Sequence, residues 1–174
     1  MGRYIPKLSV NLARKKLDIF FRHVSSFAEE NAQILVIGCG TQKTWMDRKS
    51  SFYKNIKLIY TDIDTTSMVD LYCDAYELPF IDSIFDGVIT TAVLEHVLYP
   101  ENVAKEIDRV LRIDGLLYSE IPFMQQVHEG AYDFTRYTLS GHRRLFNSFT
   151  EIDSGMVAGP GTVLAWSIEN YFLA

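Results

Sequence analysis

Two glycines and an aspartate stand where apolar runs of the sequence end. Gly38 and Gly40 follow the run ILVI and carry no Cβ, so the backbone there can turn tightly and come close to a ligand. Asp62 ends the next apolar run, 24 residues after Gly38, where a carboxylate can accept the hydroxyl protons of a ribose. Glycines are common in turns, and an aspartate also caps helices or forms turns. The two features together favour a site for a nucleoside.

The neighbouring residues limit which nucleoside this site would take. Asp74, followed by Ala75, ends a third short run and is placed to accept a hydrogen bond from the exocyclic amine of adenine. Binding of a dinucleotide requires a third glycine five residues after the first, and that position holds Lys43. NAD, FAD and a nicotinamide-dependent reductase are therefore disfavoured. Carboxylates without a phosphate cradle suit a cationic nucleoside that carries no phosphate.

A later segment combines ionisable and aromatic side chains without helical or strand periodicity, which is typical of a binding loop. Its candidate catalytic residues are His128 as a general base, Asp133 as the group that orients His128 or binds substrate, and Arg136 as a contact to substrate or an anion. Its aromatic residues could stack on a sugar ring, and they are Tyr132, Phe134 and Tyr137. The alternative is that Asp133 and Arg136 pair and lock the loop, while Thr138 caps the next helix.

Other polar residues in the first two thirds of the chain are weaker candidates. His96 follows the fourth apolar run and is a candidate substrate contact, with helix capping or packing as the alternative. Asp82 and Asp86 could be mistaken for further site carboxylates, and a structural role is expected for Asp86. Cys39 and Cys73 have no Cys-x-x-Cys or Cys/His spacing, so no metal site is expected.

The pattern of apolar residues predicts a parallel sheet with helices on both faces. Helical spacing indicates an opening amphipathic helix that ends near Asn31 and a second helix that begins near Pro100 and stops at Gly115. Two further helices are expected within 138–149 and 162–173, and a sixth strand at about 150–157. The other five strands lie within residues 34–40, 57–64, 69–75, 85–93 and 115–123. In such a sheet, ligands bind beyond the carboxyl ends of the strands, where the strand order reverses.

Size and composition exclude several kinds of protein. The 174 residues and formal charge of −5 suit one domain with an N-terminal helix (1–31), a cofactor-binding core (32–125) and a substrate loop with a C-terminal cap (126–174). A pI near 5.3 argues against a nucleic-acid partner. No apolar run reaches the roughly 18 residues that span a bilayer, so no membrane insertion is expected. Two cysteines and the lack of an apolar leader predict a cytoplasmic protein.

Four stretches, in this order, resemble the class I S-adenosylmethionine-dependent methyltransferases: ILVIGCGTQ, LIYTDID, CDAYELPFIDSIFDGVITTAVLEHV and RVLRIDGLLYSEIP. The resemblance covers about residues 30–125 and implies a doubly wound, Rossmann-like α/β fold with S-adenosyl-L-methionine as cofactor. It implies that Asp62 holds the ribose and that Asp74, with the Ala75 backbone, reads adenine. Four other residues would lie near the methionine moiety: Gly38, Gly40, Thr91 and Ala92. Gln42 replaces the family's usual third glycine, and its side chain would alter the loop or contact the cofactor.

The segment from His128 to Thr138 resembles a subgroup of that family that is often linked to polysaccharide or glycoconjugate biosynthesis. Members of the subgroup commonly have a proline between the histidine and the aspartate, and this chain has none. The resemblance implies O-methyl transfer to a small or carbohydrate-type acceptor. The alternative is a non-catalytic protein that binds the nucleoside cofactor or a protein partner.

The C-terminal part fits the family least well. A complete sheet in the family has a seventh, antiparallel strand, and only six strands are counted here. We expect either a shortened form or a naturally short variant whose apolar last helix is covered by a second copy of the chain. A homodimer would then form through apolar residues of that helix, namely Val163, Leu164, Trp166, Ile168, Tyr171 and Phe172.

Overall fold

The computed structural model, which describes residues 12–28, 31–128 and 130–173, is built around one parallel sheet. The sheet has five strands in the order β3-β2-β1-β4-β5. The strands are β1 (Ala32–Ile37), β2 (Ile56–Asp62), β3 (Leu71–Tyr72), β4 (Phe85–Thr91) and β5 (Leu111–Glu120). From β1 the chain builds outward through β2 to β3, then returns to β4 beside β1. The strand order therefore reverses between β1 and β4, as the doubly wound α/β fold predicts.

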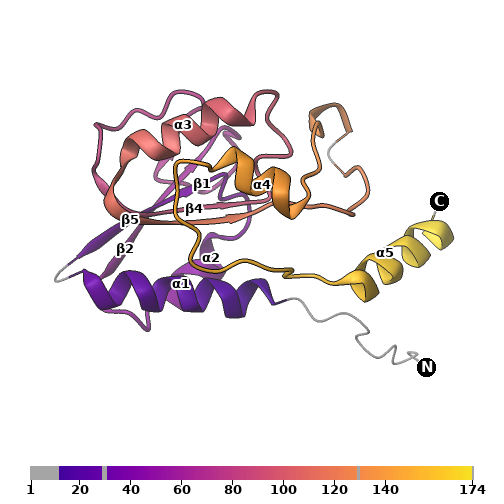
Figure 1. Cartoon of the computed structure of the whole chain (residues 1–174), viewed down its shortest axis with the longest axis horizontal. Helices are drawn as coiled ribbons and strands as arrows, with labels where there is room; N and C mark the ends of the chain where they lie inside the picture. The colour runs from indigo at the N-terminus through magenta and orange to yellow at the C-terminus, as the bar shows by residue number, and fades with distance from the viewer. Residues whose placement is uncertain (1–11, 29–30, 129, 174) are drawn as a thin grey trace.

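Helices cover both faces of this sheet, as predicted (Figure 1). On one face lie α1 (Ala13–Phe27) and α2 (Lys43–Ser50), and on the other lie α3 (Pro100–Val110) and α4 (Leu139–Leu145). Alternate residues of β1 enter the two core layers: Ile34 packs on the α1 side and Leu35 on the α3 side. Both layers bury apolar side chains, which explains why the central strands are continuous apolar runs in the sequence.

The sixth strand predicted at 150–157 does not form. Residues 151–157 form no strand, and the Val157 carbonyl accepts a 2.7 Å hydrogen bond from the Leu12 amide. Its largest apolar side chains, Ile152 and Met156, are exposed, whereas Glu151 pairs with Arg143 on the surface. The segment has too little buried apolar surface to add a strand beyond β5.

Two helix boundaries also differ from the prediction. The helix that starts at Pro100 ends at Val110, and β5 begins at Leu111, before the expected stop at Gly115. The four residues before Gly115 belong to β5, but Asp114 has φ 64° and the pairing with the start of β4 shifts register there. The first helix ends at Phe27 and not near Asn31. Two of the intervening residues, 29 and 30, lie outside the described part of the chain.

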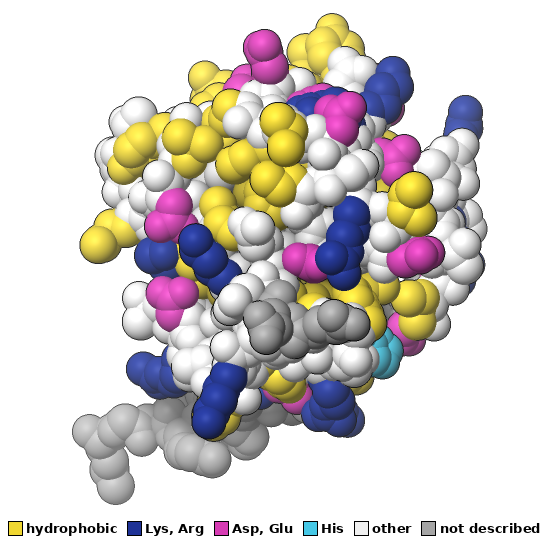
Figure 2. Space-filling model, turned by 90° about the vertical axis from the view of Figure 1, so that its left-hand side faces the viewer, with side chains coloured by type: hydrophobic (Ala, Val, Ile, Leu, Met, Phe, Trp, Pro, Cys, Tyr) yellow, Lys and Arg dark blue, Asp and Glu magenta, His cyan; other side chains and the backbone are white. Residues whose placement is uncertain are grey.

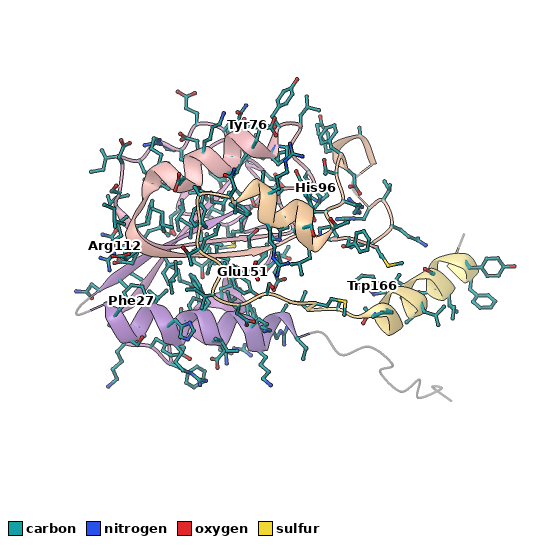
Figure 3. The ribbon with its side chains drawn as sticks, viewed as in Figure 1. Phe27, Tyr76, His96, Arg112, Glu151 and Trp166 are labelled. Atoms are coloured by element: carbon teal, nitrogen blue, oxygen red, sulfur yellow. The ribbon has the colours of Figure 1, made fainter. Side chains whose placement is uncertain are left out.

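The amino ends of the strands carry structural polar contacts. The Asp86 carboxylate accepts a 2.6 Å hydrogen bond from the Gln33 amide and pairs with Arg112, which confirms its expected structural role. Arg112 also lies over the Phe27 ring at this end of the molecule, opposite His96 (Figure 3). Figure 2 faces this end and shows basic, acidic and apolar side chains interspersed. The carboxyl edge of the sheet, where ligands bind in doubly wound folds, lies at the opposite end.

The last helix, α5 (Pro160–Leu173), extends away from the sheet (Figure 1). Several of its apolar side chains are exposed: Leu164, Ile168, Tyr171 and Phe172. None of the helices that the structure describes is both long enough and apolar enough to cross a membrane.

Candidate active site

The turn after β1 is formed by two glycines in the left-handed backbone region. Gly38 has φ 63° and Gly40 has φ 49°. A Cβ on Gly38 would lie 2.3 Å from Cγ2 of Val93, and Val93 is β-branched and stiff, so only glycine fits there. A Cβ on Gly40 would meet nothing within 4 Å. The turn therefore brings bare backbone up to open space at the carboxyl edge of the sheet.

Asp62, at the end of β2, is bound to this turn. Its Oδ2 accepts a 2.7 Å hydrogen bond from the Gly40 amide, and its Oδ1 accepts a 2.9 Å hydrogen bond from the Asp64 amide. The structure thus brings together the glycines and the carboxylate that the sequence predicted as one site. Each carboxylate oxygen has two lone pairs, so each can still accept a hydroxyl proton.

Asp74 lies at the same edge, after β3. Its carboxylate is exposed and accepts a 2.9 Å hydrogen bond from the Tyr76 amide, while Ala75 packs against the core. The following segment is held by Arg109 of α3, which donates to the carbonyl groups of Leu78 and Phe80 at 2.9 and 2.7 Å. Arg109 also pairs with Asp82 in the same segment.

The end of β4 supplies the remaining predicted cofactor residues. Gln42, at the start of α2, accepts a long 3.5 Å hydrogen bond from the hydroxyl of Thr91. Thr91 is buried, and Ala92 is exposed with φ 55°, a conformation that alanine rarely adopts. The Ala92 amide donates to the Glu120 carbonyl at 3.1 Å. Gln42 therefore spans from the glycine turn to β4, across the point where the strand order reverses.

Two histidines that are far apart in the sequence meet at this edge, beyond the ends of β4 and β5. His96 follows β4 and His128 follows β5, and their rings lie 4.8 Å apart in an edge-to-face arrangement. Nδ1 of His96 lies 2.7 Å from the carbonyl oxygen of Tyr132. Nδ1 of His128 lies 3.2 Å from the carbonyl oxygen of Gln126 and 3.4 Å from Oδ2 of Asp133. The structure therefore brings together the two predicted histidines and places Asp133 where it can orient His128.

Asp133 and Arg136 also pair with each other, which was the alternative predicted for them. The Asp133 side chain is only 1% exposed and accepts from the His128 amide at 2.9 Å and from both terminal nitrogens of Arg136. The guanidinium of Arg136 holds the pKa of Asp133 well below its usual range. The remaining donors of Arg136 bind backbone carbonyls of Gln125, Gln126 and Thr135. All five N–H groups of a guanidinium are thus used inside the loop, which favours a locking role over a direct substrate contact.

The aromatic residues of the loop divide into two sets. Tyr132 is 70% exposed and Phe134 is 45% exposed. Tyr137 is half-buried, and its ring packs near that of His142 on α4. As predicted, Thr138 caps α4, because its hydroxyl accepts a 3.1 Å hydrogen bond from the Gly141 amide. Two of the three predicted stacking residues therefore have rings open to a ligand.

Glu95 is a residue of this site that the sequence analysis missed. Its side chain is 0% exposed, and neither carboxylate oxygen has a hydrogen-bond partner among the described residues. Oε1 lies 3.7 Å from Nε2 of His96, and burial raises the pKa of Glu95. The signal in the sequence was a glutamate inside the apolar run AVLEHV. Fully buried glutamates are rare unless they are paired, so a glutamate in such a run indicates a partner or a ligand.

Comparison with known proteins agrees with this fold. Residues 35–119 match the methyltransferase domain family. A chain from the complex between the Haloferax volcanii Trm112 methyltransferase activator and a proposed methyltransferase is 20% identical, with a TM-score of 0.59, and the match covers 78% of this chain and 70% of that chain. A SAM-dependent methyltransferase from Methanosarcina mazei is 16% identical, with a TM-score of 0.55. That match covers 72% of this chain and 82% of that chain. A search of curated proteins gave no significant match.

The fold defines a doubly wound α/β protein, and Gly38, Gly40 and Asp62 lie together at the carboxyl edge of its sheet. The match to the methyltransferase domain family covers residues 35–119, which is just under half of the chain, so this part of the chain resembles a methyltransferase domain. The [4+2]-cyclase SpnF also has this fold, at 16% identity and a TM-score of 0.58 over 77% of this chain and 56% of that chain. The fold alone therefore does not fix the reaction or the acceptor.

Proposed function

We propose that the protein transfers the methyl group of S-adenosylmethionine to an oxygen atom of a small or carbohydrate-type acceptor. The observation that carries the proposal is the bond between Asp62 and the Gly40 amide, because it joins a carboxylate to bare backbone at the point where the strand order reverses. Open space over Gly40 and free lone pairs on Asp62 fit a ribose with a methionine chain beside it.

In this proposal the cofactor is held from three strand ends. Asp62 accepts the ribose hydroxyls, and Gly38 and Gly40 approach the methionine chain. Asp74 and the Ala75 backbone contact adenine, and the turn of the 74–82 segment is fixed by the contacts of Arg109. The residues at the end of β4 lie beside the sulfonium, and they are Thr91, Ala92 and Gln42. The cofactor supplies an activated methyl group, and the chain's own residues position it.

His128 is the candidate base for removing the acceptor proton. A carbonyl oxygen only accepts hydrogen bonds, so the contact with the Gln126 carbonyl places the proton of the neutral imidazole on Nδ1. Nε2 then carries the lone pair that a general base needs. The ion pair of Asp133 and Arg136 fixes the loop, and Asp133 also binds the His128 amide. The imidazole is therefore held in one orientation toward the acceptor during an in-line displacement.

The exposed rings of Tyr132 and Phe134 support an acceptor with an apolar face, such as a pyranose. An acceptor of that kind would fit a role in polysaccharide biosynthesis, in line with the resemblance of residues 128–138 to glycoconjugate-associated enzymes.

Product analysis with methyl-labelled S-adenosylmethionine tests the proposal. The full chain is incubated with simple glycosides and with the matching amino sugars, and the products are identified by mass spectrometry. We expect label on a hydroxyl oxygen and release of S-adenosylhomocysteine. Label found only on the amine would contradict O-transfer. Cofactor binding without turnover on any acceptor would favour the non-catalytic alternative.

A further inference from the structure

Glu95, His96 and His128 form a cluster of potential metal ligands at the acceptor side of the site. One ligand atom of each residue lies within 4.8 Å of the other two. Glu95 and His96 come from the segment after β4, and His128 comes from the loop after β5 (Figure 3 labels His96). The sheet order places these two segments next to each other, since β4 and β5 are neighbours. The cluster is thus a product of the fold and not of a local sequence spacing.

The buried carboxylate of Glu95 is an independent observation that indicates a ligand. It is fully buried, and neither oxygen receives a hydrogen bond from the described part of the chain. Burial of an unpartnered carboxylate is costly, and buried charges are ordinarily paired or bound to metals. Arg136 also lies in the vicinity of Glu95, but its donors all bind Asp133 and backbone carbonyls. A cation placed between Glu95 and the imidazoles would satisfy the carboxylate.

Both histidines are oriented as metal ligands are. Nδ1 of His96 faces the Tyr132 carbonyl, and Nδ1 of His128 faces the Gln126 carbonyl and Asp133. These partners only accept hydrogen bonds, so in each neutral ring Nδ1 carries the proton and Nε2 presents its lone pair. Metal-binding histidines characteristically donate their other N–H to a carbonyl or carboxylate in this way.

We propose that Glu95, His96 and His128 bind one divalent transition-metal ion of the zinc type. Two imidazole nitrogens and one carboxylate oxygen form a donor set that suits zinc and leaves a coordination position open. Ligand atoms around a tetrahedral ion lie roughly 3.4 Å apart for metal–ligand bonds of about 2.1 Å. The 3.7 Å between Glu95 and His96 is close to that spacing. Separations of up to 4.8 Å are longer than this spacing, so binding requires the His128 side chain, which is 29% exposed, to move toward Glu95 and His96.

The open position would receive an oxygen of the methyl acceptor, and this step rests on the proposed function, whereas ion binding does not. A hydroxyl bound there has a lowered pKa and loses its proton to the buffer. The resulting oxyanion attacks the methyl carbon, and the carbon–sulfur bond breaks to release S-adenosylhomocysteine. With the ion bound, Nε2 of His128 is a ligand and does not act as a base. The ion then replaces general-base catalysis by His128.

Direct ion binding tests the site. The full chain is stripped with a chelator, dialysed and titrated with zinc chloride by calorimetry, and cobalt absorption reports the coordination geometry. The chain has four histidines, so His23→Ala, on the exposed face of α1, is a matched control. We expect one ion per chain in the wild type and in His23→Ala, and at least tenfold weaker binding in His96→Ala and His128→Ala. Equal affinity in all four proteins, or no uptake by the wild type, would overturn the proposal.

A second variant separates the metal site from folding and from methyl transfer. Glu95→Gln keeps the side-chain size and removes the charge, so we expect weaker zinc binding with unchanged circular dichroism and unchanged binding of S-adenosylmethionine. Undiminished zinc binding by a folded Glu95→Gln protein would contradict the proposed ligand set. Zinc uptake without cofactor binding would contradict the proposed function alone. Methyl transfer that continues in chelator, by a protein that takes up no zinc, would contradict the metal site alone.

Discussion

The carboxylate of Asp62 accepts a 2.7 Å hydrogen bond from the amide of Gly40. This contact joins the end of β2 to the turn after β1, and both lie at the carboxyl edge of the sheet. Because the carboxylate is already held in place, little conformational freedom remains to be lost when a ribose binds to it. The geometry therefore makes Asp62 the residue whose loss should affect cofactor binding most directly.

Replacement of Asp62 by alanine should weaken binding of S-adenosylmethionine about 10- to 100-fold, because charge-assisted hydrogen bonds to the ribose are lost. Titration calorimetry measures this change. The matched control is Asp64→Ala, since the Asp64 carboxylate binds Thr66 and not the glycine turn. Equal losses in both variants would contradict the role given to Asp62.

Alanine at the two glycines should have different effects. Gly40→Ala places a methyl group in open space, so the free energy of unfolding should fall by only about 1–2 kcal/mol, the cost of the left-handed backbone, while cofactor binding weakens strongly. Gly38→Ala adds a clash with Val93, so it should destabilise the fold by about 1–3 kcal/mol more. Urea unfolding and cofactor titration separate the two effects. Wild-type cofactor affinity in Gly40→Ala would count against a ligand over that turn.

Loss of His128 should affect turnover and spare cofactor binding. His128→Ala should lower the rate of methyl transfer about 100-fold or more, because it removes either a general base or a metal ligand. Affinity for S-adenosylmethionine should stay close to that of the wild type, since His128 lies on the acceptor side. Initial rates and calorimetry give the two values. A parallel drop in cofactor affinity would show that this division of roles is incorrect.

The pair of Glu106 and Arg109 should make stability depend on pH. The guanidinium of Arg109 lowers the pKa of Glu106 in the folded state. A carboxyl group with a lowered folded pKa stabilises the protein above its unfolded pKa, and this contribution is lost as the pH falls through the folded pKa. The difference in unfolding free energy between wild type and Glu106→Gln should therefore be largest near neutral pH and shrink in acid. Urea unfolding across this range tests the sign, and a difference that grows in acid would contradict it.

We predict that the chain forms a homodimer through α5. The exposed apolar side chains of that helix favour burial against a second copy. Sedimentation should show a dimer for the wild type and a monomer for the double variant Leu164→Asp, Ile168→Asp. A wild-type monomer at high concentration would rule this interface out.

Strands were predicted correctly from the sequence where an apolar run is also buried in the folded chain. The runs that became β1 and β4 contain β-branched apolar residues that are buried in the sheet, so their strand assignment and parallel arrangement could be inferred without the structure. The same reasoning located Gly38, Gly40 and Asp62 at one edge, because strand ends in a parallel sheet meet there. The prediction of a strand at 150–157 was wrong. The apolar side chains of that segment, Ile152 and Met156, are exposed and are not packed against a helix or strand of the core.

The acceptor side was less predictable, because its geometry depends on contacts between distant segments. Sequence spacing alone does not bring His96 and His128 together, since 31 residues separate them and only the neighbouring positions of β4 and β5 do so. The complete use of the Arg136 donors by loop carbonyls is likewise a property of the folded loop. For Glu95 the sequence offers only the position of a glutamate inside the apolar run AVLEHV, and the full burial of its side chain is a property of the folded chain.

Calorimetric titration of the full chain with S-adenosylmethionine tests the central claim most directly. We expect saturable binding of one cofactor per chain, with S-adenosylhomocysteine competing for the same site. A protein that is folded by circular dichroism but gives no heat with either ligand would contradict the assignment of the Gly40–Asp62 edge as the cofactor site.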